Sequence, residues 1–289
     1  MRRKRRVSCS LVVSSPSEAL EPFSTVIVTG GSSGIGKSFI ELCGKLKPEL
    51  VFCNLSRRPA DEKIFPNFER SAKNFSCDLS DATQLAVVAA QVSAWVTGRA
   101  PPGAVLLINN SGFGSFGRFA ELPLARELQM VDLNIRAMVH LTGLLLPLLR
   151  ARGGAIVNVA STMSFQPTPY AATYGATKAF VLHWTVALNE ELRGTPVRAL
   201  AVCPGTTTTE FFRTAGLGEG AVLASFAMTT DEVVAVALRA LGARRSHVVT
   251  GWKNKLYTFA GSKLPKPLVA RIAAKVLGGF RLGARPPPH

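Results

Sequence analysis

The chain has 289 residues, five cysteines and a formal net charge of +16. The cysteines are widely spaced, odd in number and without a C-x-x-C pair, which argues against a disulfide framework or a metal site and favours a reducing, cytoplasmic location. The charge excess lies at the two ends, in RRKRR (2–6) and in eleven Lys or Arg residues without any acid from residue 233 onward, so the neutral middle argues against a nucleic-acid-binding protein.

The N-terminus, MRRKRRVSCSLVVSS, has the basic start and the short apolar stretch of a secretory signal. Serine interrupts the apolar stretch, however, and no A-x-A cleavage site follows it. We therefore expect residues 1–23 to form a basic, flexible arm.

Beyond the arm, short β-branched apolar runs alternate with longer helical patterns, which is typical of a parallel sheet buried between helices. The runs are TVIVTG (25–30), LVFCNL (50–55), AVLLINN (104–110), GAIVNVA (154–160), VRALAVCPG (197–205) and HVVTG (247–251). The sequence therefore predicts one α/β Rossmann-fold domain over residues 24–251, with a doubly wound, mostly parallel sheet and helices on both faces.

The first run leads into a glycine-rich turn, TGGSSGIG (29–36). A turn of this kind between a strand and a helix is the context of a dinucleotide phosphate site, because the start of the helix offers free N–H donors. We expect cofactor contacts from Gly30, Ser32, Ser33, Gly34, Ile35 and Gly36.

The cofactor preference is predicted about 20 residues further on, where NAD-specific proteins place an acid for the ribose 2′-hydroxyl. The chain has Ser56, Arg57 and Arg58 there. Two guanidinium groups match the oxygens of a 2′-phosphate, so NADP(H) is favoured over NAD(H). The alternative is that Arg57 and Arg58 are a solvated strand end.

The longest apolar stretch, AMVHLTGLLLPLL (137–149), is shorter than the ~18 residues of a transmembrane helix. It contains His140 and is followed by Arg150, so it is predicted to be a buried helix. Further on, TTDE (229–232) resembles a capping box that opens the helix VVAVALRALG.

Together these motifs resemble the short-chain dehydrogenase/reductase family, from about Ser24 to Gly251. TGGSSGIG is similar to the family's TGxxxGxG turn, NNSG (109–112) to its NNAG, YGATK (174–178) to its YxxxK and Pro204-Gly205 to its PG turn. Ser111 replaces an alanine of the pattern. The resemblance implies cofactor contacts from Asp78, Asn110, Pro204, Gly205 and Thr206.

The resemblance also implies a catalytic set. Tyr174 is the proton donor, and Lys178 lies four residues on, hence on the same helix face. As a cation, Lys178 is expected to lower the phenol pKa and to bind the nicotinamide ribose. Ser161, thirteen residues before Tyr174, is expected to bind the substrate carbonyl, and Asn134 to hold a water of the proton relay. By itself a Tyr-x-x-x-Lys pair also occurs on many ordinary helices.

The activity predicted from this set is NADPH-dependent reduction of a ketone or aldehyde to the alcohol. The long segment 206–228 follows the PG turn and is rich in apolar residues, so we expect a substrate loop and a hydrophobic or lipid-like substrate. Candidate pocket residues are Phe113, Phe165, Tyr170, Phe211 and Phe212. Tyr170 has no cation at i+4 and follows Thr168 and Pro169, which resemble a helix N-cap and first helical residue, so it either borders the pocket or packs at the helix start.

Residues 252–289 form a basic extension beyond the predicted domain. On a helical wheel one side of it is apolar, with Arg271 and Lys275 opposite. The apolar side comprises Leu268, Val269, Ile272, Val276, Leu277 and Phe280. It either lies peripherally on an anionic membrane or packs on the domain or a second subunit, and the resemblance implies a dimer or tetramer. The alternative function is a catalytically silent NADP(H) sensor or scaffold that binds a membrane or polyanion through its basic ends.

Overall fold

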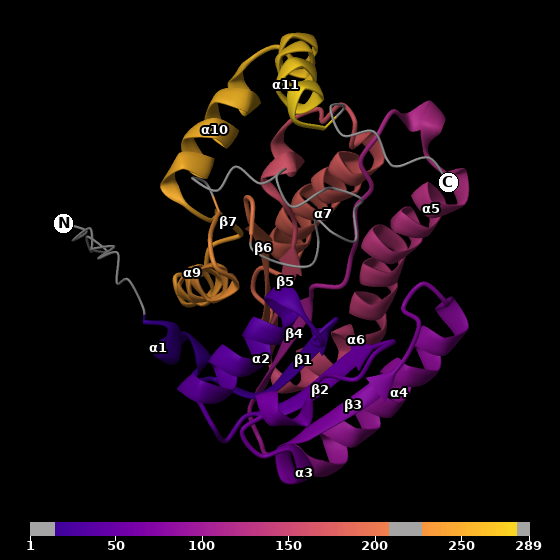
Figure 1. Ribbon diagram of the computed structural model, residues 1–289. Coiled ribbons are helices and arrows are strands. Elements are labelled where there is room, and N and C mark those ends of the chain that lie inside the picture. Colours follow the sequence, from indigo (N-terminus) through magenta and orange to yellow (C-terminus); the bar gives the residue numbers. More distant parts are fainter. Residues whose placement is uncertain (1–14, 208–226, 282–289) are drawn as a thin grey trace, which may run out of the picture.

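A computed structural model describes residues 15–207 and 227–281, without the side chains of 279–281. The basic residues 2–6, Phe211, Phe212 and the side chain of Phe280 lie outside the described residues. Among the described residues, helices and strands alternate from Pro16 to Val249 (Figure 1).

A seven-stranded, all-parallel sheet forms the centre, with the order β3-β2-β1-β4-β5-β6-β7. Its strands are β1 (Phe23–Thr29), β2 (Val51–Ser56), β3 (Ala72–Ser76), β4 (Ala104–Asn109), β5 (Gly154–Val159), β6 (Val197–Cys203) and β7 (His247–Val249). The predicted α/β fold with a doubly wound parallel sheet is confirmed. Only β3 was missed, because AKNFS is an edge strand in which Phe75 alone is buried.

Two helical layers cover the sheet, and each buries its own apolar cluster. One face packs against α1 (Pro16–Leu20), α2 (Gly34–Leu46) and α9 (Thr230–Gly242), the other against α4 (Ala82–Arg99), α6 (Met138–Arg152) and α7 (Ala172–Glu191). Shorter elements are η1 (Glu62–Ile64), α3 (Phe68–Ser71), η2 (Phe119–Glu121) and η4 (Thr162–Phe165). Because both faces are covered, β1, β2, β4, β5 and β6 are buried along almost their whole length and are mostly apolar.

The start of the domain differs from the predicted flexible arm. Ser15 and Glu18 form a capping box that opens α1, and Ala19 and Leu20 are buried in the same cluster as α9. The arm prediction failed for residues 15–23 because local capping and two buried apolar side chains order them.

The helix predicted around 137–149 is longer than expected. The elements α5 (Leu124–Val131), η3 (Asp132–Ala137) and α6 run on without a break. The resulting 29-residue helix, Leu124–Arg152, is long and apolar enough to cross a membrane by length and composition alone. A core helix meets the same criterion, and Leu141, Leu145 and Leu149 are buried in the cluster beneath the sheet.

The C-terminal extension folds as two helices, α10 (Trp252–Lys263) and α11 (Lys266–Arg281). They lie beside one another at the end of the molecule away from α3 (Figure 1). The amide of Asn254 donates to the carbonyl of Thr250 (2.8 Å), and Lys266 Nζ donates to the carbonyl of Phe165 (3.2 Å). The extension is therefore anchored on the domain.

Candidate active site

A cavity of about 1090 Å³ lies at the carboxyl ends of the strands. Carboxyl ends of neighbouring parallel strands converge at one edge of a sheet, so loops from distant parts of the chain meet there. Of the predicted cofactor residues, every one except Gly36 lines this cavity.

Gly36 does not line the cavity, but its lack of a side chain allows the start of α2 to pack closely against the glycine-rich turn. A Cβ on Gly36 would lie 2.4 Å from the carbonyl oxygen of Gly30 and 2.5 Å from Asn110 Nδ2. Gly30 has a φ of +69°, a backbone conformation that favours glycine. No side chain caps the first N–H groups of α2, whose N-cap is Ser33. These donors beside the cavity fit the pyrophosphate of a dinucleotide.

Asn110 joins this turn to the neighbouring strand. Its side chain donates to the carbonyls of Thr29 (3.0 Å) and Gly30 (3.3 Å), while its own N–H donates to Thr29 Oγ1 (2.9 Å). The ends of β1 and β4 are thereby fixed relative to one another. Asn110 thus has a structural role in addition to its place in the cavity wall.

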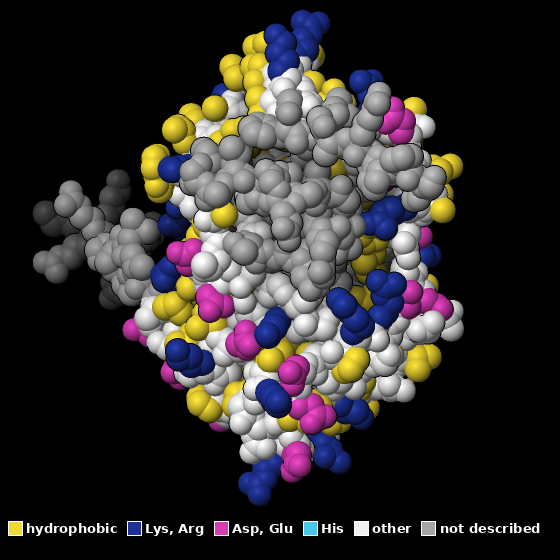
Figure 2. All heavy atoms as spheres, in the orientation of Figure 1, with side chains coloured by type: hydrophobic (Ala, Val, Ile, Leu, Met, Phe, Trp, Pro, Cys, Tyr) yellow, Lys and Arg dark blue, Asp and Glu magenta, His cyan; other side chains and the backbone are white. Residues whose placement is uncertain are grey.

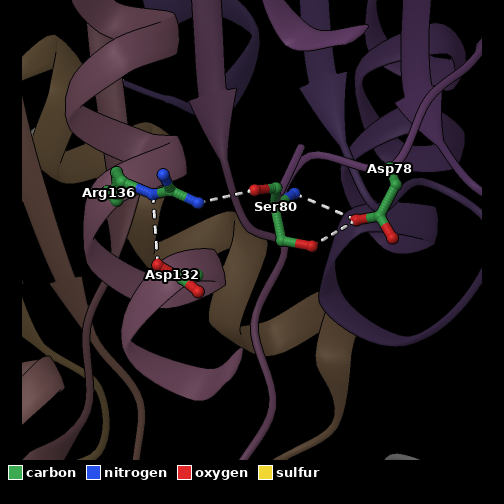
Figure 3. A network of polar contacts seen from close by, with 4 residues as sticks. All are labelled: Asp78, Ser80, Asp132 and Arg136. Atoms are coloured by element: carbon green, nitrogen blue, oxygen red, sulfur yellow. Dashed lines mark hydrogen bonds and ion pairs between the residues drawn. The ribbon is translucent and has the colours of Figure 1, made fainter. Parts of the chain in front are cut away.

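The opposite end of the cavity carries the groups expected at the adenosine half. Arg57 and Arg58 are exposed and follow β2 directly. Asp78 accepts hydrogen bonds from the hydroxyl (2.6 Å) and the N–H (3.0 Å) of Ser80. These hydrogen bonds, together with the charge of Arg57, lower the pKa of the Asp78 carboxyl. Figure 3 shows that the carbonyl of Ser80 also accepts a hydrogen bond from Arg136. Arg136 in turn forms an ion pair with Asp132 (3.1 Å).

Tyr174, Lys178 and Ser161 meet at the other end of the cavity, and each is more than nine-tenths buried. Tyr174 and Lys178 lie on one face of α7, with Lys178 Nζ 5.9 Å from the centroid of the tyrosine ring. Ser161 follows β5 and hydrogen-bonds Tyr174. Lys178 Nζ donates to the carbonyl of Val159 (2.8 Å), which holds the ammonium group in place.

Burial controls the protonation of this set. It raises the pKa of Tyr174, an effect that the hydrogen bond from Ser161 partly opposes. It also lowers the pKa of Lys178 to about 8. We expected Lys178 to lower the phenol pKa; in the structure desolvation dominates and Ser161 is the opposing group. A phenol that keeps its proton at neutral pH is suited to proton donation.

Asn134, the fourth residue of the expected catalytic set, does not line this cavity. It sits in η3, a π-helical turn, a feature common at functional sites. Its amide donates to the carbonyl of Phe113 (3.0 Å) and to Thr177 Oγ1 (3.1 Å), and its oxygen accepts from the N–H of Phe113 (3.1 Å). A second cavity of about 20 Å³, lined by Asn134, Lys178, Asn109 and Ser111 among others, adjoins it.

Of the predicted substrate-pocket residues that the structure describes, Phe113 lines the cavity, whereas Phe165 and Tyr170 do not. Phe113 lines the cavity and its ring lies 5.1 Å from the guanidinium carbon of Arg126. Phe165 does not line it; it packs against the apolar cluster to which Val181 and Leu182 of α7 belong.

Tyr170 also lies outside the cavity lining, and the predicted helix start was wrong. The helix α7 begins at Ala172, not at Pro169, because Tyr170 has a φ of +62°, which interrupts a helical path. Its carbonyl accepts from the N–H of Gly117 (2.8 Å), and Gly278 of α11 lies against its ring.

The residues that sequence reasoning missed come mainly from the C-terminal helices. Trp252, Lys253, Asn254, Leu256, Tyr257, Ala260, Val276 and Leu277 line the cavity, with Arg126 and Gln129 of α5. The side chain of Asn254 packs on Gly205, where a Cβ would lie 2.2 Å from its amide nitrogen. The apolar side of the extension was the available signal, but helical periodicity does not say which surface it covers.

A family model described as short chain dehydrogenase matches residues 24–219. The chain belongs to this family. Its members are NAD(P)-dependent oxidoreductases, in agreement with the glycine turn and the buried tyrosine and lysine.

The sequence is similar to those of two reductases. Ketoacyl reductase HetN of Nostoc sp. is 32% identical over 185 residues, which cover 63% of this chain and 62% of that protein, so the chain spans less than two thirds of its length. The 3-oxoacyl-(acyl-carrier-protein) reductase FabG of Chlamydia muridarum is 25% identical over 235 residues, covering 78% of this chain and 92% of that protein.

Solved structures of family members share the fold. A short-chain dehydrogenase from Sphingobium yanoikuyae in complex with NADPH has a TM-score of 0.69 at 25% identity, over 92% of this chain and 100% of that chain. A structure described for 7β-hydroxysteroid dehydrogenase stereoselectivity has a TM-score of 0.73 at 23% identity, over 89% of this chain and 99% of that chain. The second likeness shows the fold alone.

Proposed function

We propose that the chain is an NADPH-dependent reductase that converts the carbonyl of a hydrophobic ketone or aldehyde into an alcohol. The observation that carries this proposal is the meeting of Ser161, Tyr174 and Lys178 in one cavity with the glycine-rich turn. A buried phenol that holds its proton and a bound hydride donor are the two things that carbonyl reduction requires.

The cofactor would lie along the strand ends. The turn at Gly30–Ile35 and the start of α2 would hold the pyrophosphate, Asp78 the adenine, and Pro204, Gly205 and Thr206 the nicotinamide half. The nicotinamide supplies the hydride when the dinucleotide is bound. Arg57 and Arg58 favour the 2′-phosphate of NADPH, and the complex of the Sphingobium relative with NADPH supports that choice.

The chain's own residues supply the proton. Ser161 would donate a hydrogen bond to the substrate oxygen, and Tyr174 would transfer its proton to that oxygen as negative charge develops there. Lys178 would stabilise the phenolate that remains. The cavity beside Asn134 and Lys178 has room for about one water molecule. Asn109 also lines it, and the buried Oδ1 of Asn109 has no hydrogen-bond partner among the described residues. That position is where we place the relay water.

The substrate is inferred from the cavity wall between Tyr174 and the C-terminal helices. Apolar side chains dominate that wall: Phe113, Phe116, Leu133, Met163, Trp252, Leu256, Val276 and Leu277. Arg126, Gln129, Lys253, Asn254 and Tyr257 contribute polar groups to it. A mostly apolar wall with few polar groups fits a hydrophobic carbonyl compound, and the ketoacyl reductase names of two relatives agree with that class.

The test is NADPH oxidation by the purified protein across a panel of hydrophobic ketones and aldehydes. We expect Tyr174→Phe to lower kcat by roughly 10²- to 10⁴-fold, the contribution of a positioned proton donor. Tyr170→Phe is the matched control, since Tyr170 lies four residues away and outside the cavity wall, and it should keep most of the activity. Full activity in Tyr174→Phe would contradict the mechanism. A wild type that binds NADPH but reduces nothing would favour the sensor alternative.

A further inference from the structure

The two C-terminal helices present an exposed apolar surface, which we call the α10–α11 face. Trp252, Leu256 and Phe259 follow one another at helical spacing on α10, as do Leu268, Ile272 and Val276 on α11. Their exposed fractions are 72%, 65% and 63% on α10 and 44%, 49% and 49% on α11, and Leu264 between the helices is 43% exposed. A soluble protein rarely exposes so many neighbouring large apolar side chains on its surface unless that surface binds a partner.

The same segment is strongly basic. Residues 252–281 contain seven Lys or Arg and no Asp or Glu: Lys253, Lys255, Lys263, Lys266, Arg271, Lys275 and Arg281. In Figure 2 apolar side chains gather at the upper margin of the molecule, where Figure 1 places α10 and α11, and Lys or Arg side chains stand beside them. The face therefore combines aromatic and aliphatic groups with positive charge.

Other residues of these helices hold them on the domain. Asn254, Thr258 and Gly261 of α10 are buried, as are Val269 and Ala273 of α11. The exposed apolar residues are therefore not needed to attach the helices.

The α10–α11 face is continuous with the cavity, because Trp252, Leu256 and Val276 belong to both. A surface seated on this face would lie beside an entrance to the proposed active site. A hydrophobic substrate could then move along apolar side chains from that surface into the cavity.

We propose that the α10–α11 face docks on an anionic lipid bilayer. Interfacial binding requires an apolar strip that enters the headgroup region and basic side chains that attract acidic lipids, and this face has both. Exposed Trp252 and Tyr257 are side chains of the kind enriched at membrane interfaces. Charge complementarity selects a lipid surface over a second copy of the chain, since two copies would bring like charges close together at the contact and no acidic residue of this segment would oppose them. Docking itself does not depend on the proposed activity; only the entry of substrate by this route rests on it.

The experiment is flotation of the full chain with vesicles of phosphatidylcholine, with and without phosphatidylglycerol. We expect binding only to the anionic vesicles, weakened by salt, because exposed charges are screened. The variant Lys255→Gln/Lys263→Gln/Arg271→Gln should bind roughly 100-fold more weakly, since each basic residue near the surface contributes about a factor of five. None of these three lines the cavity, so reduction of a water-soluble substrate without vesicles should be unchanged.

Two control variants separate this face from other basic surfaces. Lys63→Gln/Arg70→Gln/Arg150→Gln removes three exposed charges elsewhere on the domain and should leave binding unchanged. A variant with glutamine at residues 2–6 tests the basic arm. If the arm variant abolished binding and the α10–α11 variant did not, the proposal would be overturned.

Fluorescence supplies a readout that does not depend on charge. The emission of Trp252 should shift to the blue on anionic vesicles, and the shift should disappear in Trp252→Phe while Trp95 and Trp184 remain. Leu268→Ser/Ile272→Ser should reduce flotation. If that variant instead changed the oligomeric state in light scattering, with no vesicle binding by the wild type, the face would be an interface between copies and the membrane proposal wrong.

Discussion

At the scale of single residues, the site depends on how completely Tyr174 and Lys178 are buried. Desolvation penalises the charged form of each group, so it keeps the phenol protonated and brings the pKa of the lysine down to about 8.

Reduction should lose efficiency as the pH rises through about 8. Below that pH Lys178 is a cation that stabilises the phenolate, and above it the charge is lost, while Tyr174 keeps its proton because its pKa is raised. The measurement is kcat/KM against pH with NADPH, which reports groups of the free enzyme. The residual activity of Lys178→Arg should not fall in this range, because a guanidinium stays charged. A flat wild-type profile to pH 10 would contradict the role of the lysine charge.

Cofactor choice is a second property of individual side chains. Arg57→Ala and Arg58→Ala should each raise KM for NADPH by about 10- to 100-fold, the equivalent of the ~1.5–3 kcal/mol of a charge-assisted hydrogen bond. KM for NADH should change little, because NADH has no 2′-phosphate. Arg70→Ala, an exposed arginine outside the cavity, is the control. Equal losses with both cofactors would show that the arginines do not contact the 2′-phosphate.

Residue spacing predicted these positions because the motifs are local. Tyr174 and Lys178 are one helical turn apart, so their shared face follows from sequence. The left-handed backbone of Tyr170 and the orientation of Phe165 do not follow from spacing, because contacts with Gly117, Gly278 and α7 decide them.

At the scale of elements, α10 links the cavity to the rest of the domain. Its Asn254 packs on Gly205, and Gly261 packs on Gln166, which also hydrogen-bonds Tyr257. The helix thereby joins the turn after β6 to the segment after Ser161.

Gly205→Ala should displace α10 and destabilise the protein by about 1–3 kcal/mol, because the new methyl group would overlap Asn254 in a packed site. The measurement is the urea midpoint of unfolding, together with KM for the substrate. Gly143→Ala is the matched control: nothing lies within 4 Å of a Cβ there, and alanine in the middle of α6 should stabilise by about 0.5–1 kcal/mol. Equal midpoints for the two variants would mean that Asn254 can move aside freely.

At this scale sequence prediction succeeded where the signal was local and failed where it was not. The capping box Thr229–Glu232 opens α9 as predicted, since its hydrogen bonds involve only four consecutive residues. The edge strand β3 escaped prediction because pairing with β2, rather than its own apolarity, places it in the sheet.

At the scale of the whole molecule, folding buries the four described cysteines Cys43, Cys53, Cys77 and Cys203. Burial raises the pKa of the thiols of Cys43 and Cys203 to about 12 and that of Cys77 to about 11, and it raises the pKa of Cys53 as well. These thiols therefore lack the thiolate form that reacts with alkylating reagents.

Iodoacetamide at neutral pH should label these four cysteines only when the domain unfolds. Mass spectrometry of the native protein should show them unmodified, and labelling should follow the urea unfolding curve. Cys9 lies outside the described residues and serves as the internal comparison. Rapid labelling of Cys203 in the native protein would show that the buried apolar cluster around it opens without global unfolding.

The amino-acid sequence was sufficient for the α/β class and for the order of the motifs, because each rests on a pattern within one strand, turn or helix. It also picked out the residues of those motifs that line one cavity. Only the tertiary structure placed α10 and α11 in the wall of the cavity, excluded Phe165 and Tyr170 from it, and aligned Asn134 with the small cavity beside Lys178. Those placements depend on packing between segments up to about a hundred residues apart, such as Lys266 on Phe165. Periodicity tells which side of a helix is apolar, but the surface that this side meets is decided by the three-dimensional fold.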